Sequence, residues 1–189
     1  MNTLMHICCA PCANRPIAQL REEGHSVTGF WFNPNIHPYT EYQALEGYAK
    51  EIGMKLIIGG RYDLRSFITN VADNIDGRCA YCYRVRMEET AKYAAEHGFD
   101  SFTTSLLISP YQKHDAIAAI AREMGQQYGV EFLYRDFRPL FREGQDFARE
   151  HGFYMQKYCG CIFSEEERYM AAKWKKEAKR REQENAGLT

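Results

Sequence analysis

The chain has 189 residues, 45% of them hydrophobic, and a formal net charge of -1 at pH 7. No apolar run approaches the roughly 20 residues of a membrane span and the N-terminus lacks a signal-peptide pattern, so we expect a soluble, cytoplasmic protein. One hydrophobic core suits this length and no Pro/Gly/Ser-rich linker divides it, so we expect a single domain over residues 1–189. The balanced charge gives no general electrostatic case for nucleic acid.

Strand and helix patterns alternate through the first half of the chain. The apolar residues 4–7 predict a buried strand, which Pro11 ends because proline has no N–H to give to a sheet. The pattern continues with a helix from residue 13 or 14 to 23, a strand over 25–32, a helix over 39–53, a strand over 55–58 and a helix over 62–70. Two prolines exclude regular strand pairing in the loop at 33–38.

The second half repeats this alternation. It predicts a helix over 81–97 closed by Gly98, a strand over 101–106, a helix over 114–128, a strand over 130–134, a helix over 144–151 and a basic C-terminal helix over about 164–185. Such a succession indicates an α/β fold with a mainly parallel open sheet covered by helices, in a Rossmann-like or HUP-like three-layer arrangement. The loops at the carboxyl ends of the strands should then share one edge, where open α/β sheets bind ligands.

Three groups of cysteine are the main chemical signal. The first strand is followed by thiols, where a phosphate-binding protein carries glycines. The chain has seven cysteines, which is an odd number, and a reducing compartment disfavours structural disulfides. Metal or redox chemistry therefore explains the clustering of the cysteines better than disulfides do. The groups are Cys8, Cys9 and Cys12; Cys79 and Cys82; and Cys159 and Cys161. We expect all three at the same edge of the sheet.

The spacing permits two sites with four thiolate ligands. Cys9 and Cys12 with Cys79 and Cys82 suit a structural zinc ion. Cys8 and Cys9 with Cys79 and Cys82 suit an iron–sulfur cluster, because adjacent thiols reach a wide inorganic core more easily than one small ion. A thioredoxin-like dithiol at Cys79 and Cys82 has less support from the spacing, although nearby arginines would favour thiolates there.

The Cys159–Gly160–Cys161 sequence could close a small, strained disulfide ring. Strained disulfides have higher reduction potentials and are the labile ones, which suits an electron relay. A second metal site completed by Cys12 is the alternative for these two thiols.

Five motifs together resemble the cobalamin-independent epoxyqueuosine reductases, the QueH family. They run in order from residue 4 to about residue 165. The motifs are HICCAPC at 6–12, NPNIHP at 33–38, Arg78-Cys79-x2-Cys82-Tyr83-x2-Arg86-Met87, TSLLISP at 104–110 and YCGC at 158–161. The resemblance implies the last step of queuosine biosynthesis, a two-electron reduction of epoxyqueuosine in a tRNA anticodon to queuosine.

The resemblance also implies the cofactor and the site. Cys8, Cys9, Cys79 and Cys82 would bind a 4Fe-4S cluster, and Cys159 with Cys161 would be a redox-active pair. Cys12 is a tentative catalytic residue beside an additional mononuclear iron. The partners implied are tRNA carrying epoxyqueuosine and an unidentified electron donor, with no membrane, and the domain is then an α/β iron–sulfur domain.

Further residues are candidates for the chemistry and for RNA. Four side chains in the loops and helices near the predicted edge are candidate proton donors to the epoxide oxygen: Tyr111, His37, His114 and Asp136. Five aromatic residues in or beside loops could either stack on bases or pack in the core, and Phe32 is assigned to the core: Trp31, Tyr39, Tyr81, Tyr83 and Tyr111. Lys113 and the basic helix could meet phosphates. The rival function is a zinc-stabilised nucleic-acid-binding module without catalysis.

Overall fold

In the computed structural model, which describes residues 1–50 and 53–186, five strands form one open, wholly parallel sheet. The strands are β1 (Asn2–His6), β2 (Ser26–Trp31), β3 (Leu56–Ile58), β4 (Ser101–Thr104) and β5 (Glu131–Phe132), in the spatial order β3-β2-β1-β4-β5. The central strand β1 places Met5 opposite Gly29 of β2 and Thr103 of β4. Strand order reverses between β1 and β4, which opens a crevice at their carboxyl ends.

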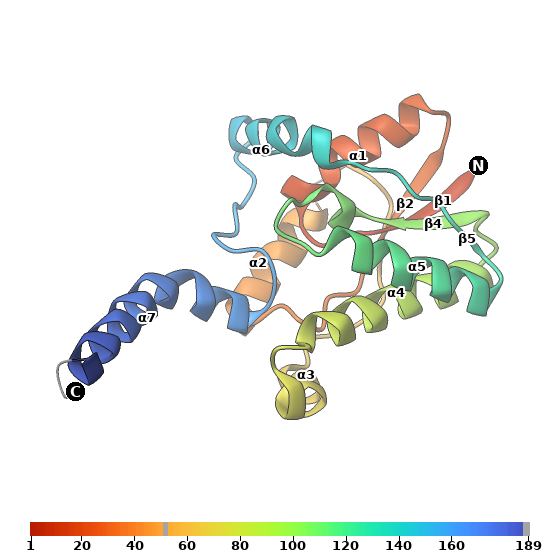
Figure 1. Cartoon of the computed structure of the whole chain (residues 1–189). Helices are drawn as coiled ribbons and strands as arrows, with labels where there is room; N and C mark the ends of the chain where they lie inside the picture. Colours follow the sequence, from red (N-terminus) through yellow and green to blue (C-terminus); the bar gives the residue numbers. More distant parts are fainter. Residues whose placement is uncertain (51–52, 187–189) are drawn as a thin grey trace.

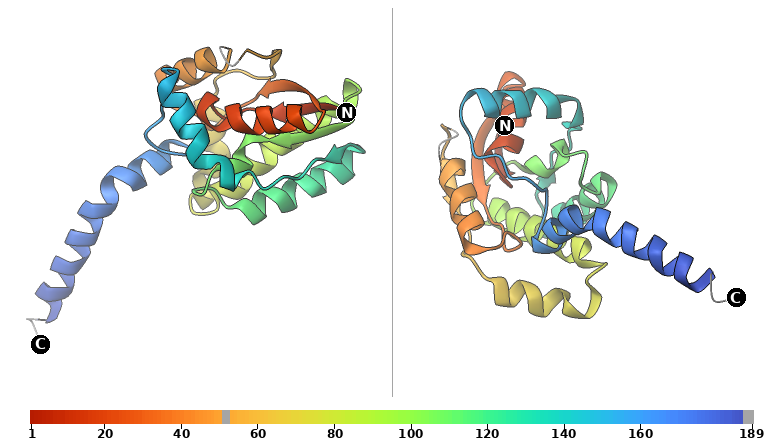
Figure 2. Two further views of the ribbon diagram at one scale, coloured as in Figure 1. Left: turned by 90° about the horizontal axis from the view of Figure 1, so that it is seen from above. Right: turned by 90° about the vertical axis from the view of Figure 1, so that its left-hand side faces the viewer.

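Helices cover both faces of this sheet, which confirms the predicted three-layer fold (Figure 1). The α-helices are α1 (Ala10–Glu22), α2 (Tyr39–Lys50), α3 (Leu64–Val71), α4 (Arg78–Glu96), α5 (His114–Tyr128), α6 (Phe141–Glu150) and α7 (Ile162–Ala186). Helices α1 and α6 lie together on one face and α4 and α5 on the other. Two further views show α7 extending away from the rest of the molecule (Figure 2).

The core lies between the sheet and these two helix layers. Leu4, Met5 and Ile7 of the first strand and its end are fully buried, as are Phe30 and Phe102 of the neighbouring strands. Each large side chain of this kind contributes about 1.5–3 kcal/mol when it leaves water. The buried strand β1 therefore fixes where the turn that follows it begins. Within the described part of the chain, no helix is both long and apolar enough to cross a membrane.

Two helices begin earlier than the sequence predicts, and both carry cysteines. Helix α1 begins at Ala10 instead of residue 13 or 14, because Pro11 occupies its first turn, where the missing N–H would have no partner. Helix α4 begins at Arg78 instead of residue 81. Cys12 and Cys79 therefore lie in the first turns of helices, near the positive ends of the helix dipoles, and Cys82 follows at the start of the second turn of α4.

The other elements match their predictions to within a few residues. The strand predicted over 101–106 ends at Thr104 and continues as a short 3-10 helix, Ser105–Ile108, because the Thr104 hydroxyl accepts a hydrogen bond from the Leu106 N–H. Of the helix predicted over 39–53, residues 51–52 lie outside the described residues. Short 3-10 helices also occupy Ala72–Asn74 and Arg138–Leu140.

Candidate functional site

The first group of thiols occupies the turn between β1 and α1. The Cys8 N–H donates to Ser105 Oγ at 2.9 Å, and the Ser105 hydroxyl donates to Cys8 Sγ at 3.1 Å. The sulfur atoms of Cys8, Cys9 and Cys12 all lie within 4.8 Å of one another. This group, which we call the thiol trio, has the compactness that a bound metal ion requires.

Hydrogen bonds set the protonation of the thiol trio. The pKa of the Cys8 thiol is well below its usual range despite its burial. The largest cause is its hydrogen bonding with Cys12 and Cys9, and the charge of Arg86 and the Ser105 hydroxyl act in the same direction. The pKa of Cys12 is raised well above its usual range by its hydrogen bonds to Cys8 and Cys9 and by burial. Cys8 is therefore the thiol of the trio that ionises most readily, because its neighbours favour the charged form.

Arg86 of α4 connects the second group of thiols to the first strand. Its side chain is buried and donates to His6 Nε2 at 3.2 Å, to Asn33 Oδ1 at 2.8 Å and to Cys82 Sγ at 3.6 Å. Burial and the adjacent guanidinium lower the pKa of His6 to about 3, so its imidazole is neutral and accepts from Arg86. His6 Nδ1 lies 2.9 Å from Thr104 Oγ1. The positive charge of Arg86 thus favours the ionised form of both Cys82 and Cys8.

Cys79 and Cys82 lie three residues apart in the first turn of α4, so their side chains share one face of the helix. Burial raises the pKa of Cys82, while Arg86 acts in the opposite direction. Of the other two arginines here, Arg78 is buried and paired with Glu167 of α7, whereas Arg84 is exposed and paired with Glu123. Arg84 therefore takes no part in the site.

The third group, Cys159 and Cys161, lies in the loop before α7. Gly160 has a φ of +140°, and a Cβ atom there would lie 2.5 Å from Ser164 Oγ, so this loop conformation requires glycine. Gln112 donates to Cys159 Sγ at 3.0 Å, and Ser109 Oγ lies 3.3 Å from the same sulfur. The Tyr83 hydroxyl donates to Gln112 Oε1 at 2.7 Å and thereby fixes the orientation of that amide.

The charges around Cys159 oppose its ionisation. Burial raises the pKa of the Cys159 thiol and the negative charge of Cys8 raises it further, against the hydrogen bonds of Ser109 and Gln112. Cys161 is buried beside Phe67 and Val71. All seven cysteines are free thiols.

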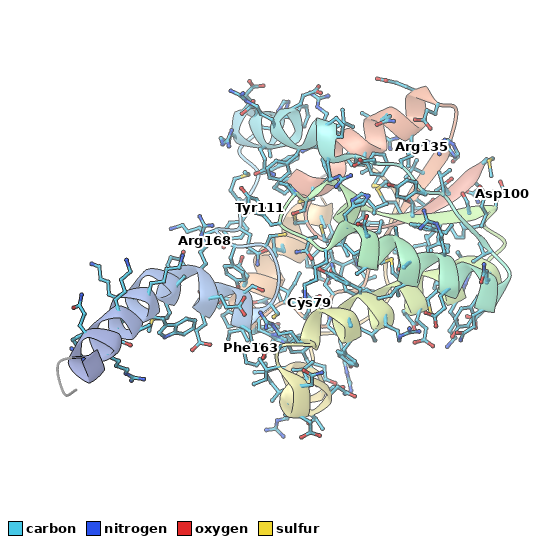
Figure 3. All side chains as sticks on the ribbon, viewed as in Figure 1. Cys79, Asp100, Tyr111, Arg135, Phe163 and Arg168 are labelled. Atoms are coloured by element: carbon cyan, nitrogen blue, oxygen red, sulfur yellow. The ribbon has the colours of Figure 1, made fainter. Side chains whose placement is uncertain are left out.

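Two cavities adjoin at Cys159. The smaller, of about 350 Å³, is lined by Arg86 and by the thiols of Cys79, Cys82, Cys159 and Cys161. The larger, of about 790 Å³, is lined by Cys9, Cys12 and Cys159 together with the side chains of α7 that face it. Tyr111 lines both cavities, and Figure 3 labels it and Cys79 on the loop and helix concerned. The three groups of thiols therefore converge at the carboxyl edge of the sheet.

The structure separates the predicted proton donors. Tyr111 is 72% exposed, and among the four candidates in the described chain it alone lines these cavities. His37 is fully buried against Tyr62 and Phe67. His114 is buried and bonds to Tyr134, and Asp136 pairs with Arg138.

The candidates for stacking on bases divide in the same way. Trp31 is fully buried and packs against Tyr42, and Tyr83 is 3% exposed, so of the two open alternatives core packing holds for both. Tyr39 and Tyr111 are exposed, Tyr81 is partly buried, and Phe32 packs against the core as expected. Lys113 lines the smaller cavity.

Sequence reasoning missed Ser105 and Gln112. Both lie at the carboxyl end of β4 or just beyond it, which is the edge where ligands were expected. Only the folded chain brings Ser105 to Cys8 and Gln112 to Cys159, across 97 and 47 residues of sequence.

Fold and thiols together define a cysteine-lined α/β protein suited to metal and redox chemistry. The family profile described as epoxyqueuosine reductase QueH matches residues 3–167. The chain therefore belongs to the epoxyqueuosine reductase QueH family and is an oxidoreductase.

Individual proteins with the same name as the family profile are also similar to this chain. Epoxyqueuosine reductase QueH of Dehalococcoides mccartyi is 39% identical, over 88% of this chain and 93% of the relative. Epoxyqueuosine reductase QueH of Thermotoga maritima is 34% identical, over 85% of this chain and 88% of the relative. The Haemophilus influenzae relative of the same name is 30% identical, over 94% of this chain and 76% of the relative. Among solved structures, a predicted subunit of a tRNA methyltransferase from Methanocaldococcus jannaschii shares the fold, with a TM-score of 0.50 and 14% identity over 80% of this chain and 88% of that one.

Proposed function

We propose that this chain reduces epoxyqueuosine in the anticodon of a tRNA to queuosine. The observation that carries the proposal is that six of the seven free thiols line two adjoining cavities, with Cys8 beside Cys9 and Cys12, in a chain of this family. The reaction removes the epoxide oxygen as water and leaves an alkene, which consumes two electrons and two protons.

We assign a 4Fe-4S cluster to Cys8, Cys9, Cys79 and Cys82, with an additional iron beside Cys12. The donor set fits such a group, because it is all sulfur, the pKa of Cys8 is lowered, and Arg86 offsets the negative charge that thiolate ligands would add. When bound, iron and sulfide would supply single electrons, and an iron with an open position would polarise an oxygen atom.

The remaining steps belong to the chain's own residues. Oxidation of the Cys159 and Cys161 dithiol to a disulfide releases two electrons and two protons, which balances the removal of oxygen as water. Tyr111 stands where both cavities meet and can hand a proton to the epoxide oxygen. An external reductant must then restore the two thiols.

Anaerobic turnover of epoxyqueuosine-containing tRNA with a reductant tests the proposal. Wild type should form queuosine, whereas Cys82→Ser and Cys159→Ser should lose most of this activity. Arg84→Gln, on the exposed side of the same helix as Cys82, is the control and should retain it. Full activity in Cys82→Ser would remove the cluster assignment.

Metal analysis tests the cofactor separately. The thiol trio is compact enough for a single small ion, and this favours zinc as the competing occupant. Anaerobically purified protein should be brown, and it should contain more iron than acid-labile sulfide because the additional iron brings no sulfide. A colourless protein with one zinc would support the binding module instead.

A further inference from the structure

Helix α7 begins at the site and leaves the molecule. Its first turn is fixed by Arg78 of α4, which pairs with Glu167 and lies over the Phe163 ring at 5.4 Å. Beyond that turn the helix extends outward in all views (Figures 1 and 2). It also runs past the segment that the family profile matches, which ends at residue 167.

The extended part of α7 is strongly cationic. Between residues 168 and 181 the sequence has seven Lys or Arg residues and a single carboxylate, Glu177. Arg168, Lys175 and Lys179 follow one another at intervals of seven and four residues, which places them on one face of the helix, with Lys176 beside them. All four are exposed. We call these four residues the cationic stripe.

This arrangement disfavours the isolated helix. Like charges four residues apart, such as Lys175 and Lys179, cost a few tenths of a kcal/mol. The apolar face beside the stripe is short among the described side chains: Met170 and Trp174 lie four residues apart on one side of the helix, and Tyr169 lies on another. A membrane surface would require a longer apolar face. A polyanion, by contrast, would neutralise the stripe.

The cationic stripe starts at the wall of the larger cavity. Arg168 and Tyr169 line that cavity with Cys9, Cys12 and Cys159. Figure 3 places Arg168 at the base of α7, with the rest of the stripe following outward. From residue 168 to residue 179 the helix rises about 16 Å, enough to follow several phosphates of one nucleic-acid strand. An RNA strand lying on the stripe would therefore be guided toward the thiols.

We propose that the cationic stripe holds the sugar–phosphate backbone of the substrate RNA beside the nucleotide that enters the larger cavity. Tyr169, which is 56% exposed, and Tyr111 would stack on neighbouring bases. The inference rests on the proposed function, because that function supplies the RNA. It assigns affinity for RNA to a helix that is separate from the redox chemistry.

The test compares two variants that each lose three positive charges. One is K175Q/K176Q/K179Q. The other is R21Q/K55Q/K92Q, whose exposed cations lie near the amino ends of the strands or the far ends of helices. Binding of an unmodified anticodon stem-loop RNA to the metal-loaded protein is measured by fluorescence anisotropy from 50 to 300 mM salt, so the result does not depend on turnover.

The stripe variant should bind the RNA about tenfold or more weakly than wild type at 150 mM salt. Its slope of log affinity against log salt should fall by about two, while the control variant keeps the wild-type slope. With epoxyqueuosine-containing tRNA, KM should rise in the stripe variant and kcat should stay within about twofold.

Three outcomes would contradict the proposal that the cationic stripe binds RNA. Equal binding by both variants, or no RNA binding by wild type, would exclude it. Light scattering that shows an oligomer lost only in the stripe variant would make the stripe a self-association surface instead. If wild type binds the RNA through the stripe but reduces no epoxyqueuosine, the proposed reaction fails and the RNA surface stands.

Discussion

At the scale of single residues, neighbours distinguish thiols that are alike in sequence. Cys8 accepts hydrogen bonds beside Arg86 and ionises easily, whereas Cys159 is buried near that negative charge and resists ionisation. The motifs were enough to predict that these cysteines share a site. They could not predict the difference between them, because Ser105 and Gln112 reach the sulfurs only through the fold.

Gln112→Leu should make Cys159 harder to ionise. The substitution removes an amide that donates to Cys159 Sγ at 3.0 Å. A hydrogen bond to a charged group contributes about 1.5–3 kcal/mol, so the pKa of Cys159 should rise by about one unit or more. Alkylation of Cys159 by iodoacetamide at pH 8, followed by peptide mass spectrometry on metal-free protein, should slow about tenfold. Gln126→Leu, exposed on α5, is the control, and equal rates in both variants would contradict the prediction.

At the scale of elements, Arg86 joins α4 to the ends of β1 and β2 through His6 and Asn33. Arg86→Met should leave these buried acceptors without a donor and lower the free energy of unfolding by about 2–4 kcal/mol. Arg84→Met, two residues away in the same helix, loses an exposed ion pair worth about 0–1 kcal/mol. Urea denaturation of the two variants measures the difference. Similar losses would show that Arg86 does not connect these elements.

Hydrophobic periodicity predicted most elements, and the exceptions have physical reasons. Helix α4 begins at Arg78 without a side-chain cap, so the sequence carries no start signal there. Trp31 ends a strand of a sheet covered on both faces, where alternation cannot tell an inward residue from an exposed one. The sequence left the role of Trp31 open for that reason, while the edge that gathers the thiols followed from the predicted order of strands and helices.

At the scale of the whole molecule, two buried imidazoles should make stability depend on pH. Burial lowers the pKa of His37 to about 4, and burial with Arg86 lowers that of His6 to about 3. The unfolded chain protonates both near pH 6.5, so between pH 6.5 and 4 it binds more protons than the folded chain. The stabilisation is complete above pH 6.5 and decreases as the pH falls.

Unfolding by urea at pH 7 and pH 5 measures this dependence. Each imidazole should cost about 2 kcal/mol of folding stability at pH 5. His37→Gln should therefore lose about 2 kcal/mol less than wild type between the two pH values. His97→Gln, at an exposed position, is the control and should match wild type. Identical losses in wild type and His37→Gln would show that His37 does not contribute.

The chain keeps every one of its sulfhydryl groups at a single edge, and the described core beneath that edge is built mainly of aliphatic and aromatic side chains, without a disulfide. Oxidation by air should consequently be confined to the side of the molecule that carries the thiols. An aerated sample should go inert while its circular dichroism and melting transition stay almost unchanged.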